Sequence, residues 1–460
     1  MANSSQTFDV VVVGAGTAGA AAAYHFARTG RRTALVDRGS MEAAGARWVN
    51  GVSPWMFEMS GIPLPEGEEI RAADFAVSIQ NASRTKRMDI RRSPLWNIDM
   101  RLLVARLHTL GRGQGVAFFP SMALSDLEFD GDRPVAANMA TQDGATVRFE
   151  AGLFVDASGL SGVLRTRVPA LASACPMPER IDLCDAAQQV RRVLDHRAAE
   201  AWLKKRGVRA GETVSYLGVD GGFSTLNVEV DFDESTVELL TGTIATDDYK
   251  PGLQLIEEFV AEHEWIGEEV FGGSGLIPLR RPYDRFVSPG AALIGNAACQ
   301  VFPAHGSGIG TGMIAAKMLA EACEGVEDVG ALGPLWEYQA TFMRSIGATN
   351  AAYDVFRKLS QRIGSSELEQ LVGSPLMPAV TTIAALDQRM PKLGPVDLAK
   401  MAAGALQHPG LVFKMLPTVM RMNTVYAHYK LYPKEPDMDR LAAWARRADK
   451  LVGPTPTHRA

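Results

Sequence analysis

The stretch from Phe8 to Arg38 reads FDVVVVGAGTAGAAAAYHFARTGRRTALVDR, and it decides the fold. Val10 to Val13 is an unbroken β-branched run, which is typical of a strand buried on both faces of a parallel sheet. A glycine turn comes next, then a helix kept thin by Ala20 to Ala23, and then Thr33 to Val36 as a returning parallel strand. This order predicts the first βαβ unit of a doubly wound sheet.

The glycines of this stretch stand at GxGxxG spacing, at Gly14, Gly16 and Gly19. The first allows a tight turn, the second lets the backbone approach a pyrophosphate, and the third lets the helix pack closely on the strand. The phosphates would lie at the positive end of the helix. Asp37 ends the second strand, where a carboxylate can accept hydrogen bonds from a ribose diol. The spacing alone is a weak signal, but the complete order predicts a dinucleotide site.

Length and composition exclude several classes of protein. A chain of 460 residues is long enough for two or three domains. A net charge of −5 provides no basic surface for a nucleic-acid partner. The four cysteines form no CxxC pair, so we expect neither a disulfide framework nor a metal site, and a reducing cytoplasm fits. The first residues lack a basic region and the apolar run is cut by glycines, which argues against a signal peptide or membrane span.

The middle of the chain is predicted to add two further sheets. Strands are expected within Phe75–Ile90 and Val116–Val155, the latter as a meander with turns at Asp130-Gly131 and Asp143-Gly144. Beyond residue 180 we expect a helix over Asp185–Lys205, strands over Thr213–Leu217, Gly222–Asp231 and Val237–Ala245, and a helix over Gly252–His263. Such an alternating sheet, away from the nucleotide site, is a plausible substrate platform.

A second glycine-rich helix start follows the small-residue run Ala291–Ala298, at Pro303–Gly310. It again offers backbone N–H groups and a positive helix end to an anion or a polarised ring. A flavin dinucleotide uses two such sites, one for its diphosphate and one for the pyrimidine edge of its ring.

With these turns in place, the chain resembles a superfamily of FAD enzymes that comprises aromatic-hydroxylase-like monooxygenases, flavin halogenases and geranylgeranyl reductases. The matching segments are Gly14-x-Gly16-x-x-Gly19 with Asp37, Asp156-Ala157-Ser158-Gly159-Leu160-Ser161 with Arg165, and Gly295-Asn296-Ala297-Ala298 with Pro303 and Gly306-x-Gly308-x-Gly310. Their order and spacing agree over about residues 8–330.

The resemblance implies an α/β fold, α+β overall, with a Rossmann-like FAD-binding domain of glutathione-reductase type and its β-meander. An inserted antiparallel-sheet substrate domain and a helical C-terminal region complete it. The FAD-binding domain would comprise residues 1–75, 96–170 and 286–330, the substrate domain residues 76–95 and 171–285, and the helical region residues 331–460.

The same resemblance implies which residues hold FAD. The diphosphate falls to the first glycine turn, the adenosine ribose to Asp37, the ribityl region to Asn296, and the flavin ring to Pro303–Gly310. The full expected set is Gly14, Gly16, Ala18, Gly19, Asp37, Arg38, Arg101, Ala157, Gly159, Gly295, Asn296, Pro303, Gly306, Gly308, Ile309 and Gly310. Where the family usually has Asp, Asn296 still accepts a ribityl hydroxyl bond, without the assistance of charge.

Each of the other candidate residues has both a functional and a structural interpretation. Trp48, Asn50 and Phe223 could line a ring-shaped or apolar substrate, although packing explains the aromatic residues equally well. Arg101 could reach a phosphate or be an ordinary exposed charge. His305 could donate a hydrogen bond to substrate or flavin, and would then titrate near neutral pH, or it could be a structural histidine.

We expect noncovalently bound FAD and, most favoured, a monooxygenase that acts on an apolar or aromatic small molecule with O2. Only one complete βαβ fingerprint is visible, so NAD(P)H would visit the flavin transiently or a partner would supply electrons. The alternatives are a geranylgeranyl-reductase-like reductase of C=C bonds, a flavin halogenase and a non-catalytic flavin-fold scaffold. The halogenase segment Trp-x-Trp-x-Ile-Pro is absent, and Gly221–Leu226 replaces the aromatic-x-Trp-x-Phe-Pro segment of the reductases.

Residues 331–460 are predicted to be mostly helical and are rich in methionine, including Met401, Met415, Met420 and Met422. Core packing is the favoured interpretation, and an adaptable surface for an apolar ligand is the second. Docking to a membrane surface is disfavoured, because the sequence shows no sustained basic face. The sequence does not indicate an oligomeric state.

Overall fold

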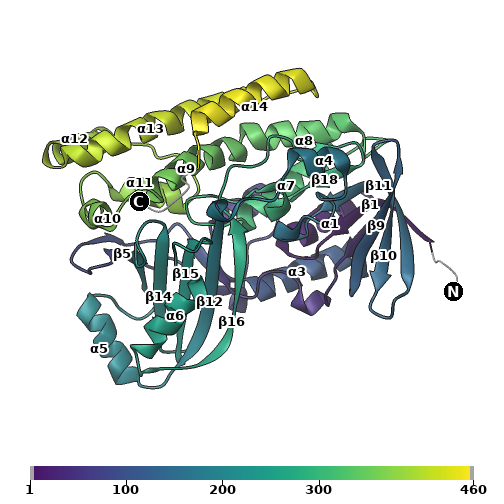
Figure 1. The fold of residues 1–460 in the computed structure, drawn as a ribbon. Coiled ribbons are helices and arrows are strands. Elements are labelled where there is room, and N and C mark those ends of the chain that lie inside the picture. The colour runs from purple at the N-terminus through teal and green to yellow at the C-terminus, as the bar shows by residue number, and fades with distance from the viewer. Residues whose placement is uncertain (1–4, 456–460) are drawn as a thin grey trace.

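The parallel sheet predicted from the valine run forms the centre of the first half of the molecule (Figure 1). The computed structural model describes residues 5–455. β1 (Ser5–Val13) runs parallel to β2 (Thr33–Val36) on one side and to β11 (Thr146–Asp156) on the other. The sheet order is β17-β18-β11-β1-β2-β8, with β8 at Ala117–Phe119, β17 at Val287–Ser288 and β18 at Ala291–Leu293. Segments from both ends of the first three hundred residues therefore meet in one sheet.

A meander hangs on this sheet, as expected. β9 (Met122–Asp130) and β10 (Arg133–Thr141) pair antiparallel, and β10 pairs with β11. The turns lie at the predicted positions, where Gly131 and Gly144 have φ of 58° and 82°. Glycine is favoured at both positions because only it adopts positive φ without cost.

The helices that cover the parallel sheet begin with α1 (Thr17–Arg28), which packs against α3 (Met100–Gly113) and α7 (Ile309–Ala322). α2 (Pro54–Ser60) packs on α7. α1 and α7 approach closely because small residues face each other: a Cβ on Gly312 would lie 3.1 Å from the Cβ of Ala18. The starts of the two glycine-headed helices are thus held side by side.

The second sheet corrects one expectation. Its order is β16-β12-β15-β14-β13-β5-β6, with β5 at Val77–Asn81, β6 at Arg87–Ile90, β12 at Leu183–Val193, β13 at Thr213–Leu217, β14 at Ser224–Asp231, β15 at Thr236–Ile244 and β16 at Ile266–Pro278. The helix predicted over Asp185–Lys205 is wrong in its first half: β12 occupies that part, and α5 begins only at His196 and ends at Arg206. Most neighbours are antiparallel, but β13 and β5 run parallel.

The apolar loop expected after the second strand folds into a small third sheet of β3 (Val49–Val52), β7 (Trp96–Asp99) and β4 (Ile70–Ala72). It is fixed to the second sheet through a side chain. The amide of Gln188 on β12 accepts a hydrogen bond from the Val49 backbone N–H at 2.5 Å and donates one to the Val49 carbonyl at 3.0 Å. A buried amide that satisfies both backbone groups of one residue mimics a strand neighbour.

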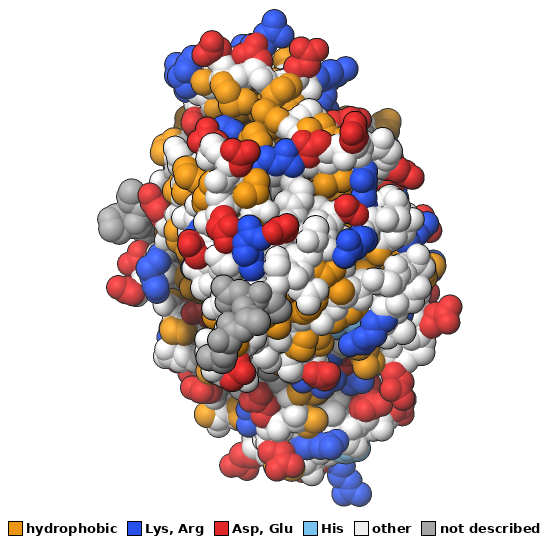
Figure 2. Space-filling view, turned by 90° about the vertical axis from the view of Figure 1, so that its right-hand side faces the viewer, with side chains coloured by type: hydrophobic (Ala, Val, Ile, Leu, Met, Phe, Trp, Pro, Cys, Tyr) orange, Lys and Arg blue, Asp and Glu red, His pale blue; other side chains and the backbone are white. Residues whose placement is uncertain are grey.

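The remaining helices cover both sheets. α4 spans Pro169–Ala174, α6 Gly252–Ala261, α8 Leu332–Arg344, α9 Ile346–Ser360, α10 Ser365–Leu371, α11 Ala379–Leu386, α12 Pro395–Gln407, α13 Pro409–Tyr429 and α14 Met438–Val452. The yellow helices α13 and α14 run along the outside of α9 (Figure 1). No helix within residues 5–455 is both long and apolar enough to cross a membrane. The end facing the viewer in Figure 2 carries acidic and basic side chains interspersed with small apolar areas.

These observations confirm the fold class: a Rossmann-like α/β unit with a meander, a largely antiparallel second sheet and a helical C-terminal region. The domain boundaries given above remain expectations, and their ends at residues 1–4 and 456–460 lie outside the described residues.

Candidate functional site

The first glycine turn packs directly against the second fingerprint. Gly14 has φ of 107°, and a Cβ there would overlap the carbonyl oxygen of Ala157 and lie 2.8 Å from the Ser158 nitrogen. A Cβ on Gly19 would overlap the carbonyl oxygen of Gly14 itself. Both positions therefore need glycine for packing within the protein, in addition to any contact with a ligand.

The start of α1 is suited to an anion. Its N-cap is Gly16, which has no side chain to cap the helix, and the first turn contains no acidic residue. The first N–H groups of a helix have no partner inside it, so they remain available to a phosphate at the positive end. α7 begins in the same way, with Gly308 at its N-cap and Ile309 as its first residue. The two helix starts fit the two anionic or polarised parts of a flavin dinucleotide.

Asp37 lies where its carboxylate holds the turn and still has room for a ribose. One oxygen accepts a hydrogen bond from Ala15 N–H at 2.7 Å, and the other from Gly39 N–H at 2.8 Å. A carboxylate has about four acceptor positions, so two remain. Arg38 next to it is exposed.

The second fingerprint is organised by Asp156, which is fully buried at the end of β11. One oxygen accepts from the N–H and the hydroxyl of Ser158, and the other from the N–H groups of Leu164 and Arg165, at 2.6 to 3.0 Å. The turn that contains Ala157 and Gly159 is thereby closed on itself. Gly159 has φ of 73° and nothing within 4 Å of an added Cβ, so the turn opens into free space.

The third fingerprint meets the first around Ala18. A Cβ on Gly295 would lie 3.2 Å from the Ala18 Cβ, and a Cβ on Gly308 would lie 3.2 Å from Oδ1 of Asn296. Gln300, which the sequence analysis did not single out, fixes this turn by accepting a hydrogen bond from Gly295 N–H at 2.8 Å. The structure thus brings all three predicted glycine turns to one place.

Two expected members of the ring-binding segment have packing roles. Pro303 is buried, and a Cβ on Gly310 would overlap the side chain of Met56 on α2. Gly306 has φ of 77° and lies next to Ile277 and Leu279 of the second sheet. The segment therefore joins the first sheet to the proposed substrate platform.

His305 belongs to the predicted flavin ring site, which we call the recess, and it is exposed. Even so, desolvation by the surrounding protein lowers the pKa of its imidazole to about 4, against smaller opposing effects of backbone hydrogen bonds at Ala385, His305 itself and Leu386. The imidazole is consequently neutral at pH 7, which corrects the expectation that it titrates near neutral pH.

A segment that the sequence did not point to, residues 385–389 at the end of α11, lies next to His305. Trp55 Nε1 donates a hydrogen bond to Asp387 at 3.0 Å, and the Arg389 guanidinium stacks 4.5 Å from the Trp55 ring centre. The hydroxyl of Tyr353 donates to the Arg389 carbonyl at 3.0 Å. A segment from the last quarter of the chain is thus held next to the predicted flavin ring site.

The candidate substrate residues lie around the second sheet on the side of the third sheet. Trp48 lies over a glycine strip of β16, 3.4 Å from an added Cβ at Gly273 and 3.7 Å from one at Gly275. Phe223 packs with Ile277 and Leu279, the residues next to Gly306. Asn50 is paired with Ile98 inside the third sheet. Trp48 therefore lies over β16, Phe223 lies in the apolar cluster next to Gly306, and Asn50 lies on the strand that β12 fixes.

Arg101, at the start of α3, is paired within the protein. Its guanidinium donates to Asp99 at 2.5 and 3.0 Å through Nη2 and Nε and stacks 3.7 Å from the centre of the Phe271 ring. Burial acts to raise the pKa of the Asp99 carboxyl, but the hydrogen bonds and charge of Arg101 outweigh it and the pKa is lowered. The guanidinium has five N–H donors and these bonds use two, so a role of Arg101 toward a phosphate stays a prediction.

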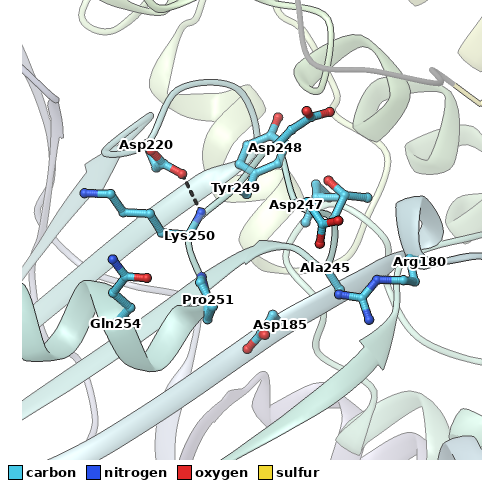
Figure 3. A pocket seen from close by; sticks show the side chains of 12 residues that line it. Arg180, Asp185, Asp220, Ala245, Asp247, Asp248, Tyr249, Lys250, Pro251 and Gln254 are labelled. Carbon is cyan, nitrogen blue, oxygen red and sulfur yellow. Dashed lines mark hydrogen bonds between the residues drawn. The ribbon is translucent and has the colours of Figure 1, made fainter.

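A separate pocket of about 440 Å³ lies on the opposite face of the second sheet (Figure 3). Asp185 lines it, and because side chains alternate along a strand, Asp185 points away from Gln188 and Trp48. The lining is polar, with Asp220, Asp247, Asp248, Lys250 and Arg180 around it. Within residues 5–455 no group of His, Cys, Asp and Glu side chains is arranged to hold a metal ion.

Comparison with known proteins points to FAD enzymes. Residues 9–169 match the family model described as FAD dependent oxidoreductase. The chain is 24% identical over 476 aligned residues to digeranylgeranylglycerophospholipid reductase of Sulfolobus acidocaldarius, covering 97% of each chain.

Solved structures show the same fold. A geranylgeranyl bacteriochlorophyll reductase-like protein from Thermoplasma acidophilum superimposes with a TM-score of 0.69 at 16% identity, over 90% of this chain and all of that one. A flavin-dependent brominase gives a TM-score of 0.60 at 15% identity, over 88% of this chain and all of that one. The expected resemblance to FAD enzymes is confirmed, and the solved structures show the shared fold. The Ala157 turn packs on Gly14, the Gly295 turn packs on Ala18, and the family model matches residues 9–169, so the protein is an FAD-dependent oxidoreductase with FAD as its cofactor.

Proposed function

We propose that the protein is a reductase that hydrogenates C=C bonds in the isoprenoid chain of a lipid. The observation that carries this proposal is similarity to a digeranylgeranylglycerophospholipid reductase along 97% of both chains. That length includes the C-terminal region whose segment 385–389 lies next to His305. The alternative that the sequence analysis ranked below monooxygenase is therefore the function we favour.

The lining of the recess supports an apolar substrate. Phe223, Ile277 and Leu279 belong to one apolar cluster, next to Gly306 of the predicted ring-binding segment. Such apolar side chains suit a long unbranched or methyl-branched chain. The absence of the aromatic-x-Trp-x-Phe-Pro segment leaves the choice among isoprenoid chains to these residues.

FAD, when bound, supplies the hydride. The residues of this chain bind and orient the reactants and exclude water. The N–H groups at the start of α7 would stabilise negative charge that develops at the pyrimidine edge of the ring. The hydrogen bond between Trp55 and Asp387 holds segment 385–389 next to His305. Nδ1 of His305 accepts a hydrogen bond from Ser307 N–H at 3.4 Å, so the neutral imidazole has a donor left to offer, and it carries no charge into the recess.

The experiment uses the FAD-loaded protein, reduced anaerobically with NAD(P)H or dithionite and then mixed with a lipid that carries geranylgeranyl chains. We expect the flavin spectrum to return to the oxidised form without O2, and mass spectrometry to show a product that has gained hydrogen only. The monooxygenase prediction is tested in the same cuvette. If the flavin stays reduced with the alkene and reoxidises only with O2, giving an oxygenated product, the reductase proposal fails.

His305→Asn is expected to lower turnover about tenfold, the effect of one lost hydrogen bond of roughly 1.4 kcal/mol, by the same factor at every pH between 6 and 9. The factor is constant because a histidine with a pKa of about 4 is neutral over this whole range. Rates are normalised to FAD content, since loss of cofactor would imitate a catalytic defect. A change in the parent's turnover near pH 6.5 that the variant lacks would contradict the lowered pKa of His305. Unchanged turnover in the variant would make His305 a packing residue.

A further inference from the structure

The outer side of α12 and α13 exposes large apolar side chains that a water-facing helix pair does not need. Val396 and Leu406 on α12 are 66% and 86% exposed, and Phe413, Leu416 and Met420 on α13 are 83%, 53% and 63% exposed. Phe413, Leu416 and Met420 follow at helical spacing and so share one stripe. We call these five residues the apolar C-terminal face.

The two stripes point outward together, because both helices pack by their other sides on one small cluster. Leu411 of α13 is buried against Leu371 and Leu376, with Ala405 of α12 packed against the same cluster. A Cβ on Gly404 of α12 would lie 2.9 Å from the Pro375 side chain, which confirms that this side faces inward. Leu406 and Phe413, on either side of the junction at His408, are therefore left to the solvent.

The charge around this face is opposite to that of the whole protein. Residues 391–425 contain Lys392, Lys400, Lys414 and Arg421 but a single acidic residue, Asp397, whereas the chain carries a net charge of −5. All four basic side chains are exposed, but Lys414 is paired with Glu367 of α10, so the local excess is two positive charges. Exposed apolar residues flanked by lysines on a helix pair suit the interface of a bilayer that carries anionic lipids. The basic excess is local, which is why the sequence pattern of the whole region does not reveal it.

An apolar path connects this face with the recess. Met377 packs on the cluster under α12 and α13 and also on the cluster that contains Ile79, Leu217, Ile383 and Leu386. The backbone of Leu386 reaches His305. α11, which carries Ile383 and Leu386, is composed of AVTTIAAL and has no fully buried residue, so apolar surface continues along it.

We infer that the apolar C-terminal face docks on an anionic phospholipid bilayer, so that an apolar substrate passes from the membrane along α11 to the recess at His305. The inference deepens the proposed function and rests on it for the identity of the substrate, but the docking step does not depend on turnover. Lys392, Lys400 and the exposed part of Lys414 face the headgroups, and Leu406 and Phe413 enter the boundary of the acyl chains.

The test is flotation of the FAD-loaded protein with vesicles of phosphatidylcholine and phosphatidylglycerol in equal amounts, without substrate. We expect the parent to float with these vesicles, and high salt to weaken binding. The double variant Leu406→Glu, Phe413→Glu should lower the bound fraction on the order of tenfold, since it removes buried apolar area and adds repelled charge. The matched control is Leu194→Glu, Val270→Glu, which changes two exposed apolar residues at the second sheet and should float like the parent.

Flavin absorbance and melting temperature establish that each variant is folded. If the parent stays at the bottom with anionic vesicles, or if the double variant floats as well as the control, docking through this face is wrong. A parent that is a dimer in solution, made monomeric by the double variant and unable to float, would assign the face to a second copy and overturn the inference.

Reduction of a short, water-soluble prenyl alcohol separates this inference from the proposed function. If the parent reduces the prenyl alcohol but does not float with vesicles, docking is wrong and the reductase proposal stands. A parent that floats but reduces no alkene removes the reductase proposal and leaves docking intact.

Discussion

Gly14→Val is expected to yield protein that binds less than a tenth of the FAD of the parent and is prone to aggregation. A β-branched residue at φ of 107° is strained by on the order of 1–3 kcal/mol. The larger effect is steric, because the new Cβ would overlap the Ala157 carbonyl oxygen and force the first two fingerprints apart. FAD absorbance per chain after gel filtration measures the loss.

Gly30→Val is the matched control for this substitution. Gly30 also has positive φ, 80°, but nothing lies within 4 Å of its added Cβ. Gly30→Val introduces the conformational strain without the steric overlap. This control should therefore keep its FAD, and with it the yellow colour, while losing some stability. Equal FAD content in the two variants would show that contact between Gly14 and Ala157 does not govern cofactor binding.

Arg357→Leu is expected to destabilise the protein by about 3–5 kcal/mol at pH 7, because it leaves a buried charge without its partner. Arg357 on α9 is fully buried and donates to Asp354 at 2.6 Å and to Asp182 at 2.8 Å. Asp182 directly precedes β12, so the guanidinium joins the C-terminal helices to the second sheet. Urea unfolding followed by circular dichroism measures the loss.

The sign of the pH dependence follows from Asp354. Burial acts to raise the pKa of this carboxyl, but Arg357 and Lys358 outweigh it and lower the pKa in the parent. The parent therefore holds this stabilisation above the usual carboxyl pKa and loses it as pH falls. Without Arg357 burial dominates, the carboxyl is protonated more readily, and the gap between variant and parent should narrow toward pH 4.

The control for the second substitution is Arg440→Leu, which removes an exposed arginine that pairs with Asp437 at 3.2 Å. A pair this exposed contributes about 0–1 kcal/mol, so little change is expected. A loss at Arg357 no larger than at Arg440, or a gap that widens in acid, would contradict the role of the buried charge.

The βαβ unit at the start of the chain was predictable because its local pattern and its tertiary role agree. The strand over Thr33–Val36 has the predicted bounds, and the buried run Val10–Val13 forms the end of β1. The glycine turns were predictable for a similar reason. The positive φ and close contacts of Gly14 and Gly295 are demands that glycine alone meets, so the sequence displays them directly.

The strands β12 and β16 could not be predicted from their local sequence. Ala186-Ala187-Gln188-Gln189 is a sequence of good helix formers, yet it forms strand because Gln188 completes its hydrogen bonds with Val49 and both of its neighbours are strands. β16 contains Gly272, Gly273 and Gly275, which strand propensity disfavours. Trp48, from a distant part of the chain, lies over Gly273 and Gly275, whereas a Cβ on Gly272 would overlap the carbonyl oxygen of Gln188.

The cover of the site and the state of His305 depend on contacts between distant parts of the chain. Nothing near Asp387 in the sequence indicates that it meets Trp55, and the lowered pKa of His305 arises from protein that surrounds it in three dimensions. The exposure of Phe413 and Leu406 is equally invisible in the sequence, where they read as further core residues.

The order in which the ribosome delivers the chain gives the central sheet a further consequence. β1 emerges first, but its parallel partner β11 is complete only at Asp156, and β18 follows at Ala291. Contacts this distant along the chain make folding slow, because long loops must lose conformational entropy by closing before these contacts can form. A nascent chain that stops before α7 has the first helix start and lacks the second. The cofactor can therefore be captured in full only after most of the polypeptide has left the exit tunnel, and partly made chains depend on chaperones rather than on FAD.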